Sequence, residues 1–297
     1  MYLSCLLIDT GDNPDRPRPG RLWLRNLYHV HQRLCMAFPS ALRKKGDPEF
    51  LAPYAPDDFP EQRYLADKKK TEVDPEVLKQ VHSRRSPEAG FLFRIDPQPG
   101  GRALIVVQSA AEPNWDYAFH NARYLLAAPH ELKPFEPCFT NGQRLRFRLA
   151  ANPTRRLSEH SLERDGRPVE EKWIGKRVPV PHDQLLDWLA EWRFRQDGQD
   201  EPSGFCIDRD RTMVQPGYMY FKKPKEGRQS RCQDHTDIKG DGVGRSLFSA
   251  RYEGILEVTE PDKFCNTLLR GVGPGKAFGF GLLSVAPCRT PAVADAL

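Results

Sequence analysis

The residues best suited to chemistry lie in one amphipathic segment near the start of the chain, where Tyr28 and His31 stand three positions apart. Apolar side chains recur around them at helical spacing, and Asn26 is a residue type that caps a helix. At about 100° per residue, His31 falls at the edge of the apolar stripe with Tyr28 beside it, whereas His29 points away. An imidazole beside a phenol predicts a general acid–base site; the alternative is a histidine that only packs in the core.

A second segment with chemical capacity is the glycine-rich run from Gly271 to Gly281, which contains Lys276. Glycines let a backbone approach a phosphate closely, and the lysine supplies positive charge. The run follows an expected helix and its lysine precedes neither serine nor threonine, so it is not a nucleotide-binding P-loop. A turn that only connects two elements is the alternative interpretation.

The third feature is a run of alternating arginine and apolar residues at 144–149, which predicts a strand with three guanidinium groups on one face. No acidic residue occurs from 142 to 156, and more cations follow. Paired RNA is held through its phosphates and 2′-hydroxyls, which suits spaced cations; an exposed face that only confers solubility is the alternative. The candidate RNA-binding cations are Arg144, Arg146, Arg148, Arg155, Arg156, Lys172, Lys176 and Arg177.

Composition limits the remaining function classes. The 297 residues suffice for two domains, and the formal charge of +5 is too small to establish a nucleic-acid partner. The seven cysteines include no CxxC pair, which favours reduced thiols. A metal site at Cys206, Cys232 and His235 is conceivable but has no second ligand pair, so no metal is expected. No apolar run is long enough to cross a membrane and no leader-like segment precedes residues 2–8, which favours a cytoplasmic protein.

The order of elements predicts an α+β fold. In the first half, a strand at 2–8 and a loop at 12–20 lead into the histidine helix, and a hairpin follows at 90–95 and 102–108. A charged, proline-rich insertion is expected at 43–89. The second half reads as strand, helix, strand, strand, helix, strand, with the elements after 144–149 expected at 182–194, 204–207, 218–222, 248–258, 261–269 and 277–287, and an exposed hairpin tip at 223–245.

This order predicts two ferredoxin-like (RRM-like) domains in tandem, at residues 1–140 and 141–297. The first domain carries the Tyr28/His31 helix, and the second carries the arginine strand and the glycine-rich run.

The sequence resembles the CasE family, the CRISPR-RNA-processing endoribonucleases of type I-E Cascade. The resemblance spans both ends and the middle of the chain, outside the insertions. It rests on Met1-Tyr2-Leu3-Ser4, on Leu27-Tyr28-x-x-His31-x-x-Leu34 with Phe38-Pro39, on Phe147-Arg148-Leu149 with Ala151-Asn152-Pro153-Thr154, and on the runs from Gly271 to Ala277 and from Gly279 to Pro287.

The resemblance implies metal-independent, cofactor-free cleavage of CRISPR repeat RNA at the 3′ base of a stem-loop, with His31 as the catalytic histidine and Tyr28 as the helix tyrosine. It also implies that the glycine-rich loop packs near that helix and contacts the RNA backbone through Gly271, Gly273, Lys276 and Gly279. The implied partners are the repeat stem-loop and other Cascade subunits, especially the backbone subunit. A non-catalytic RNA-binding subunit remains the alternative function.

Overall fold

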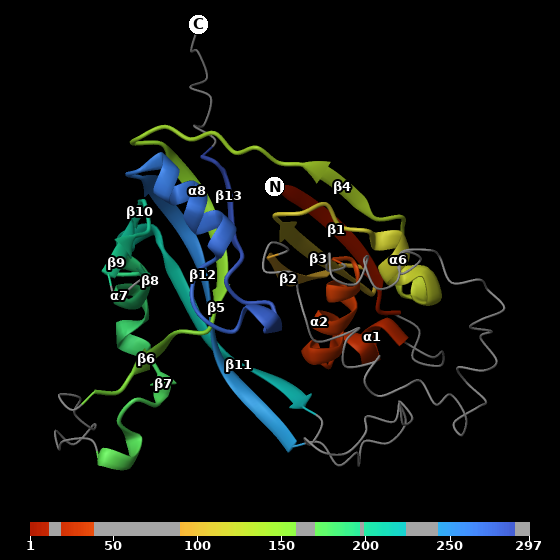
Figure 1. Cartoon of the computed structure of the whole chain (residues 1–297), viewed down its shortest axis with the longest axis horizontal. Coiled ribbons are helices and arrows are strands. Elements are labelled where there is room, and N and C mark those ends of the chain that lie inside the picture. Colours follow the sequence, from red (N-terminus) through yellow and green to blue (C-terminus); the bar gives the residue numbers. More distant parts are fainter. Residues whose placement is uncertain (12–18, 39–89, 159–169, 197–198, 224–242, 289–297) are drawn as a thin grey trace, which may run out of the picture. The chain divides into compact units, whose positions relative to one another are not determined.

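The computed structural model describes residues 1–11, 19–38, 90–158, 170–196, 199–223 and 243–288 (Figure 1). They form two compact units. The first comprises Met1–Glu136, Tyr220–Ser246 and Ala277–Gly279, and the second comprises Pro137–Met219, Leu247–Lys276 and Phe280–Leu297. The whole of the expected insertion at 43–89 and most of the expected hairpin tip lie outside the described residues. Among those described, no helix is long and apolar enough to span a membrane.

The first unit is built on a four-stranded antiparallel sheet with the strand order β2-β3-β1-β4. Because β1 pairs with β3 along its whole length, alternate side chains of both strands share one face, and Leu6 lies opposite Ile105. The strands are β1 (Tyr2–Asp9), β2 (Phe91–Gln98), β3 (Arg102–Ser109) and β4 (Glu131–Pro134).

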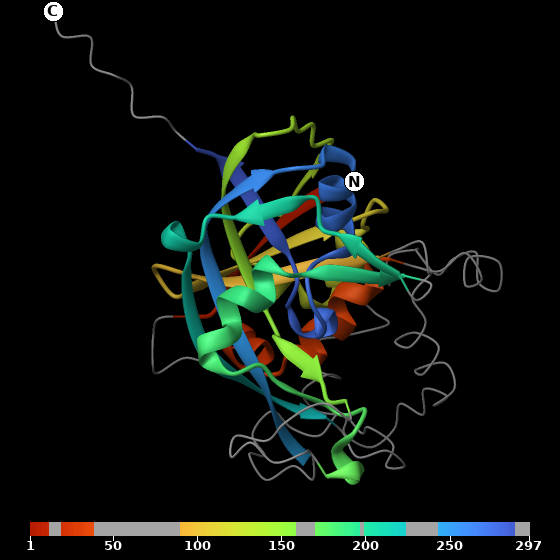
Figure 2. The ribbon, with the colours of Figure 1, turned by 90° about the vertical axis from the view of Figure 1, so that its left-hand side faces the viewer.

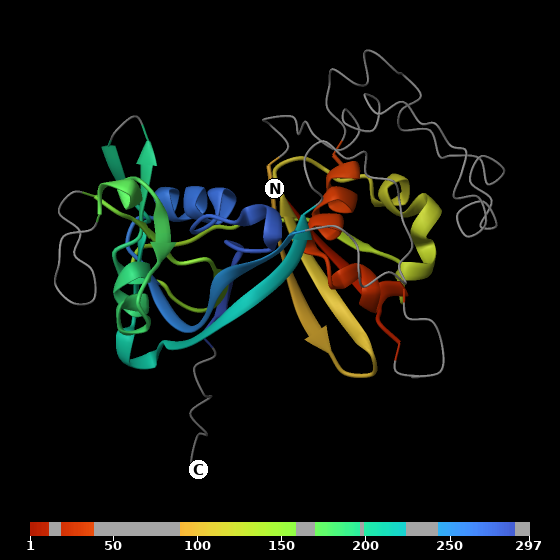
Figure 3. The same ribbon diagram turned by 90° about the horizontal axis from the view of Figure 1, so that it is seen from below.

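Helices cover one face of this sheet (Figure 3). They are α1 (Pro19–Leu24), α2 (Leu27–Met36) and α6 (Trp115–Phe119), which continues as the 3₁₀ segment η1 (His120–Leu125). Val30 and Leu34 of α2 are fully buried against the strands. Trp115 of α6 is buried too, and its Nε1 donates to Ser4 Oγ at 2.9 Å, so the ring loses no hydrogen bond on burial.

The second unit repeats this topology. Its main sheet has the order β10-β12-β5-β13, with β11 also paired to β12. Two helices pack on the same core (Figure 2). The Tyr252 hydroxyl of β12 donates to the Leu185 carbonyl at 3.1 Å. The elements are β5 (Arg144–Ala151), α7 (Leu185–Ala190), β10 (Phe205–Ile207), β11 (Met213–Lys223), β12 (Val243–Val258), α8 (Pro261–Arg270) and β13 (Leu283–Pro287). The end of β11 from Tyr220 and the start of β12 as far as Ser246 are counted with the first unit.

The smaller described elements of the second unit are two short ribbons and three 3₁₀ turns, and a fourth 3₁₀ turn, η5, is divided between the two units. They are β6 (Thr154–Arg156) with β7 (Arg177–Pro179), β8 (Arg193–Gln196) with β9 (Gln199–Pro202), η2 (Glu171–Trp173), η3 (His182–Gln184), η4 (Arg209–Arg211) and η5 (Lys276–Phe278). In both units the element order is strand, helix, strand, strand, helix, strand, and the first strand lies between the third and the last. The prediction of an α+β protein with tandem ferredoxin-like folds is confirmed.

Two predicted element boundaries in the second unit are wrong. The helix expected at 182–194 is a 3₁₀ turn followed by α7, which ends at Ala190, because the backbone from Arg193 onward pairs with β9 instead. The strand expected at 277–287 begins only at Leu283. Gly279 and Gly281 have φ values of 80° and 92°, which no strand accommodates.

Other elements begin earlier than expected. The loop predicted at 12–20 already becomes helical at Pro19, where a fixed φ suits the first helical turn. Strand β11 starts at Met213 and extends to Lys223, and β12 starts at Val243, so strand residues occupy both ends of the predicted hairpin tip. Residues 224–242 of that tip lie outside the described residues.

Candidate active site and RNA-binding surface

Helix α2 presents the candidate acid–base pair. The Asn26 side chain accepts a hydrogen bond from the Tyr28 backbone N–H at 3.2 Å and so caps the helix, as predicted. Tyr28 and His31 are half-buried, whereas His29 is exposed. The helical phase expected from the sequence is therefore the one observed, with His31 at the margin of the buried face.

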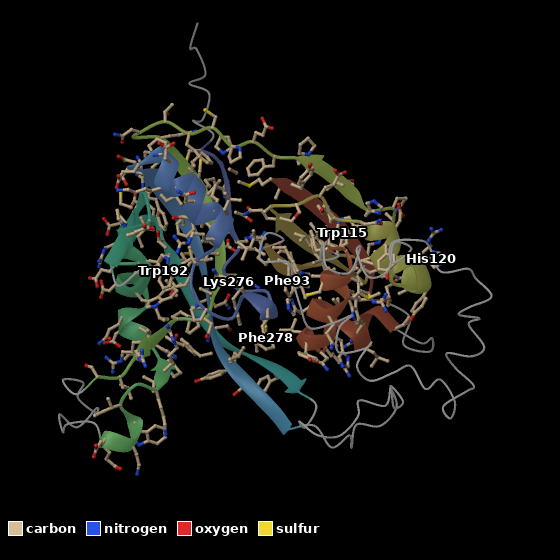
Figure 4. The ribbon with its side chains drawn as sticks, in the orientation of Figure 1. Phe93, Trp115, His120, Trp192, Lys276 and Phe278 are labelled. Carbon is tan, nitrogen blue, oxygen red and sulfur yellow. The ribbon has the colours of Figure 1, made fainter. Side chains whose placement is uncertain are left out.

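The imidazole of His31 is held by aromatic and sulfur contacts. Its ring centroid lies 5.6 Å from that of Phe91 and 6.3 Å from that of Phe93, with interplanar angles of 31° and 16°. Both phenyl rings are buried on β2; Figure 4 labels Phe93. The Cys35 Sγ lies 3.5 Å from His31 Nε2. The catalytic candidate therefore sits on an apolar platform that the sequence analysis did not identify.

Strand β5 shows the predicted alternation, with its three arginines exposed and the intervening apolar side chains buried. Two of these arginines are in ion pairs at 2.9 Å, Arg144 with Asp208 and Arg148 with Glu253. Over the described residues, Arg146 has no acidic partner. The local absence of acidic residues did not reveal these pairs, because both carboxylates come from distant parts of the chain. Positive charge on this face is smaller than the sequence suggested.

The remaining candidate cations lie on what we call the basic ribbon, formed by β6, η2 and β7, and all are exposed. Arg156 Nε donates to the Gly175 carbonyl at 3.0 Å, and Lys176 Nζ lies 4.4 Å from the centre of the Trp173 ring. Lys172 pairs with Glu170 at 2.5 Å. None of these contacts buries a cation, so all five side chains remain accessible to a ligand.

The glycine-rich run begins where α8 ends. Gly271 and Gly273 have φ values of 71° and 81°, and a Cβ on Gly273 would lie 3.1 Å from the Trp188 ring. A Cβ on Gly281 would lie 2.9 Å from the Val272 carbonyl oxygen. Backbone conformation and close packing therefore account for these glycines, and both interpretations of the run, connecting turn and RNA-binding loop, are compatible with that geometry.

Lys276 closes the C-terminal end of α8. Its Nζ donates to the Arg270 carbonyl, one of the acceptors that a helix end leaves without an intrahelical partner (Figure 4). Burial, with a smaller contribution from the Arg270 charge, lowers the pKa of Lys276 below its usual value of 10.5. The lysine expected to contact RNA therefore also has a structural task within its own unit.

This lowered pKa predicts how Lys276 affects stability. Between the folded pKa and 10.5 the unfolded chain binds more protons at Lys276 than the folded chain does, so this group makes stability rise with pH through that window. We expect Lys276→Met to show a smaller rise in the free energy of unfolding there than the wild type. Denaturant titrations from pH 8 to 10.5, with the exposed Lys263→Met as control, measure the difference; identical profiles for wild type and Lys276→Met contradict it.

The structure offers no support for a metal site at Cys206, Cys232 and His235. Cys232 and His235 lie outside the described residues, and Cys206 is exposed on β10. Within the parts of the chain that the structure describes, no group of three or more His, Cys, Asp or Glu side chains could hold a metal ion.

A family model for CRISPR associated protein matches residues 68–287, most of the chain. The chain belongs to this CRISPR-associated protein family. The CRISPR-associated endoribonuclease Cse3 of Thermus thermophilus is 34% identical over 205 residues, covering 66% of this chain and 80% of that protein. The Cascade subunit CasE of Escherichia coli K12 is 24% identical over 97% of this chain and 100% of its own length.

Solved structures of Cse3 share the fold of this family member. Cse3 bound to a 19-nucleotide RNA aligns with a TM-score of 0.59 at 27% identity, covering 97% of this chain and 100% of that one. Thermus thermophilus Cse3 bound to an RNA that represents a pre-cleavage complex aligns with a TM-score of 0.56 at 26% identity, covering 96% and 98%. These similarities extend along the whole CRISPR-associated chain and include both ferredoxin-like units.

The sequence-predicted site residues of this family member divide between the two units. Tyr28 and His31 belong to the first, whereas the arginines of β5, the basic ribbon and Lys276 belong to the second. Sequence reasoning missed Cys35, although its spacing of four from His31 on a predicted helix could have indicated the contact. It also missed Phe91 and Phe93, because the apolar pattern predicted their strand but not its contact with His31.

Proposed function

We propose that this chain is the endoribonuclease that cleaves the repeat stem-loops of precursor CRISPR RNA into mature CRISPR RNA. The ribose 2′-OH on the 5′ side of the scissile phosphate attacks phosphorus, and the 5′ oxygen of the next nucleotide leaves. The products carry a 2′,3′-cyclic phosphate and a 5′-OH. The substrate supplies the nucleophile, so the reaction requires neither a metal ion nor a cofactor.

His31 is the proton-transfer group of this reaction. It acts as base toward the 2′-OH or as acid toward the leaving oxygen, and Tyr28 orients the phosphate or makes the complementary transfer. The observation that carries the proposal is the half-buried placement of both side chains on α2, with the His31 ring stacked with Phe93 and tilted against Phe91. An imidazole held in this way needs little reorganisation when it meets its substrate.

The cations of the second unit hold the RNA. Arg155, Arg156, Lys172, Lys176 and Arg177 of the basic ribbon contact stem phosphates, and Arg146 adds a cation without an acidic partner among the described residues. Arg144 and Arg148 contribute after exchange of their carboxylate partners for phosphate. Lys276 and backbone N–H groups at Gly271, Gly273 and Gly279 stabilise charge on the RNA backbone.

The product stays bound, and the chain works as a subunit of the Cascade ribonucleoprotein in the cytoplasm. Two features support this assignment: its similarity along nearly its full length to the Cascade subunit CasE, and its similarity to Cse3 in complexes with RNA. Its protein partners are the other Cascade subunits, with the backbone subunit as the principal contact.

One cleavage assay tests the function. Purified protein is incubated in EDTA with the stem-loop repeat of its own CRISPR array and with a copy that carries 2′-deoxyribose at the scissile position. We expect a single cut with a 2′,3′-cyclic phosphate end on the first RNA and none on the second. Tight binding without any cut replaces the proposal with a non-catalytic RNA-binding subunit; cleavage of the deoxy copy refutes the 2′-OH mechanism.

The basic ribbon makes its own prediction. The double variant Arg155→Ala/Arg177→Ala removes two exposed cations, so stem-loop affinity should fall at low salt. The plot of log K against log salt concentration should become less steep, because its negative slope loses about 0.7–0.9 in magnitude for each phosphate that the variant no longer neutralises. Fluorescence anisotropy with the 2′-deoxy RNA between about 50 and 300 mM salt, a range that includes the physiological value of about 150 mM, measures both quantities. Arg123→Ala, an exposed arginine of η1, is the control; a double variant that matches it excludes the ribbon from RNA binding.

A further inference from the structure

Cys35 follows His31 by one turn of α2, and the two side chains meet. Cys35 Sγ lies 3.5 Å from His31 Nε2 and 4.0 Å from Nδ1, within the range of a sulfur hydrogen bond. Both residues are half-buried, so water does not fully surround either side chain and compete for the contact. The fully buried positions of this helix are Val30 and Leu34. Cys35 therefore lies on the side of the helix that carries the imidazole.

The aromatic contacts and the thiol restrain different motions of the ring. Phe91 and Phe93 are two residues apart on β2, so they lie on one face of the strand, and their rings are inclined to the imidazole by 31° and 16°. Stacking of this kind limits the tilt of the imidazole, but it does not select which ring nitrogen faces outward. A hydrogen-bonding atom beside one nitrogen does make that selection.

A thiol is suited to this task because it is both a weak donor and a weak acceptor. It can donate to an unprotonated ring nitrogen or accept from a protonated one, so the contact survives a change in the charge of His31. A partner held at one imidazole nitrogen leaves the other nitrogen facing outward. In an acid–base reaction, that other nitrogen is the one that exchanges a proton with the substrate.

We propose that Cys35 is a positioning residue for RNA cleavage: its thiol, which lies closer to Nε2 than to Nδ1, holds the ring orientation with which His31 meets the scissile phosphate. This inference rests on the function proposed above, since it gives Cys35 a role only where His31 transfers protons. Cys35 itself touches neither the RNA nor the reacting atoms.

Single-turnover cleavage rates from pH 5.5 to 9 test the inference. The variants are Cys35→Ala, which removes the polar contact; Cys35→Val, which removes it without leaving a cavity; and Cys35→Ser, which restores a donor and acceptor. Cys5→Ala is the matched control, because Cys5 is another half-buried thiol of the same unit whose charged neighbours are Glu131 and Lys133. Affinity for the 2′-deoxy RNA is measured in parallel.

We expect Cys35→Ala and Cys35→Val to cleave about three- to tenfold more slowly, the rate equivalent of one hydrogen bond, at unchanged RNA affinity. Their pH–rate profiles should shift along the pH axis relative to wild type, and Cys35→Ser should recover both rate and profile. A purely structural role for Cys35 would lower the rate without moving the profile. Cys5→Ala should match wild type throughout.

The outcomes distinguish this inference from the function beneath it. If wild type cleaves in a His31-dependent way but Cys35→Val keeps its rate and pH profile, the role of Cys35 is refuted and the proposed function stands. If wild type does not cleave, the proposed function is refuted. If His31→Ala cleaves as well as wild type, the assignment of His31 is refuted. Comparison with the valine variant, which leaves no cavity, keeps the test decisive where the alanine variant loses packing.

Discussion

His31→Ala is expected to lower the single-turnover cleavage rate by roughly 10²- to 10⁴-fold, the range that a positioned proton-transfer group contributes. Affinity for the 2′-deoxy stem-loop should change little, because the cations assigned to RNA binding lie on the other unit. The rate is measured with enzyme in excess over labelled repeat RNA, and the affinity by anisotropy. A loss of this size in the rate alone identifies chemistry, since a binding defect would change both.

The same helix provides the control. His29 is exposed and lies two residues before His31, so His29→Ala makes an identical chemical change in the same element without removing the half-buried ring. We expect this variant to cleave within about twofold of wild type. If both variants lose activity equally, the effect belongs to the helix and the assignment of His31 is wrong. If His31→Ala cleaves normally, another residue transfers the proton.

The largest expected effect on stability is at Gly204, which precedes β10. Its φ is +76°, and a Cβ there would lie 2.4 Å from the Phe264 backbone nitrogen and 2.6 Å from the Glu260 carbonyl oxygen. Its own carbonyl accepts from the backbone N–H groups of Thr259 and Glu260 at 2.9 and 3.1 Å, at the start of α8. An alanine therefore forces apart the junction that holds this helix on the sheet.

Gly204→Ala should cost about 3 kcal/mol or more, the combined effect of backbone strain and a clash with backbone atoms that cannot move alone. Gly142→Ala is a matched control. Gly142 has the same φ of +76°, yet nothing lies within 4 Å of the position that its Cβ would occupy. We expect it to cost about 1–2 kcal/mol, the strain alone. Thermal and denaturant unfolding measure the free energy of unfolding of both variants. Equal decreases would mean that the close approach at Gly204 does not contribute to the loss of stability.

Local pattern was sufficient where an element's own residues decide its structure. The asparagine cap and apolar spacing predicted α2 and the phase that separates His31 from His29, and Pro261 predicted the start of α8. Alternation predicted β5 and its exposed arginines. The helix expected as far as Phe194 failed because pairing of β8 with β9 depends on residues beyond the segment itself. Helical periodicity carries no information about such a competing partner.

The sequence by itself therefore determined the tandem ferredoxin-like order, the helix that carries Tyr28 and His31, and the strand that carries the arginines, because period and capping act over a few residues. Only the tertiary structure decided what surrounds these groups. It brought Glu253 beside Arg148 through the β5–β12 register, and it brought the rings of β2 beside His31 by packing α2 on the sheet. Such contacts join residues tens of positions apart, and sheet register and helix packing, which depend on the whole unit, set them.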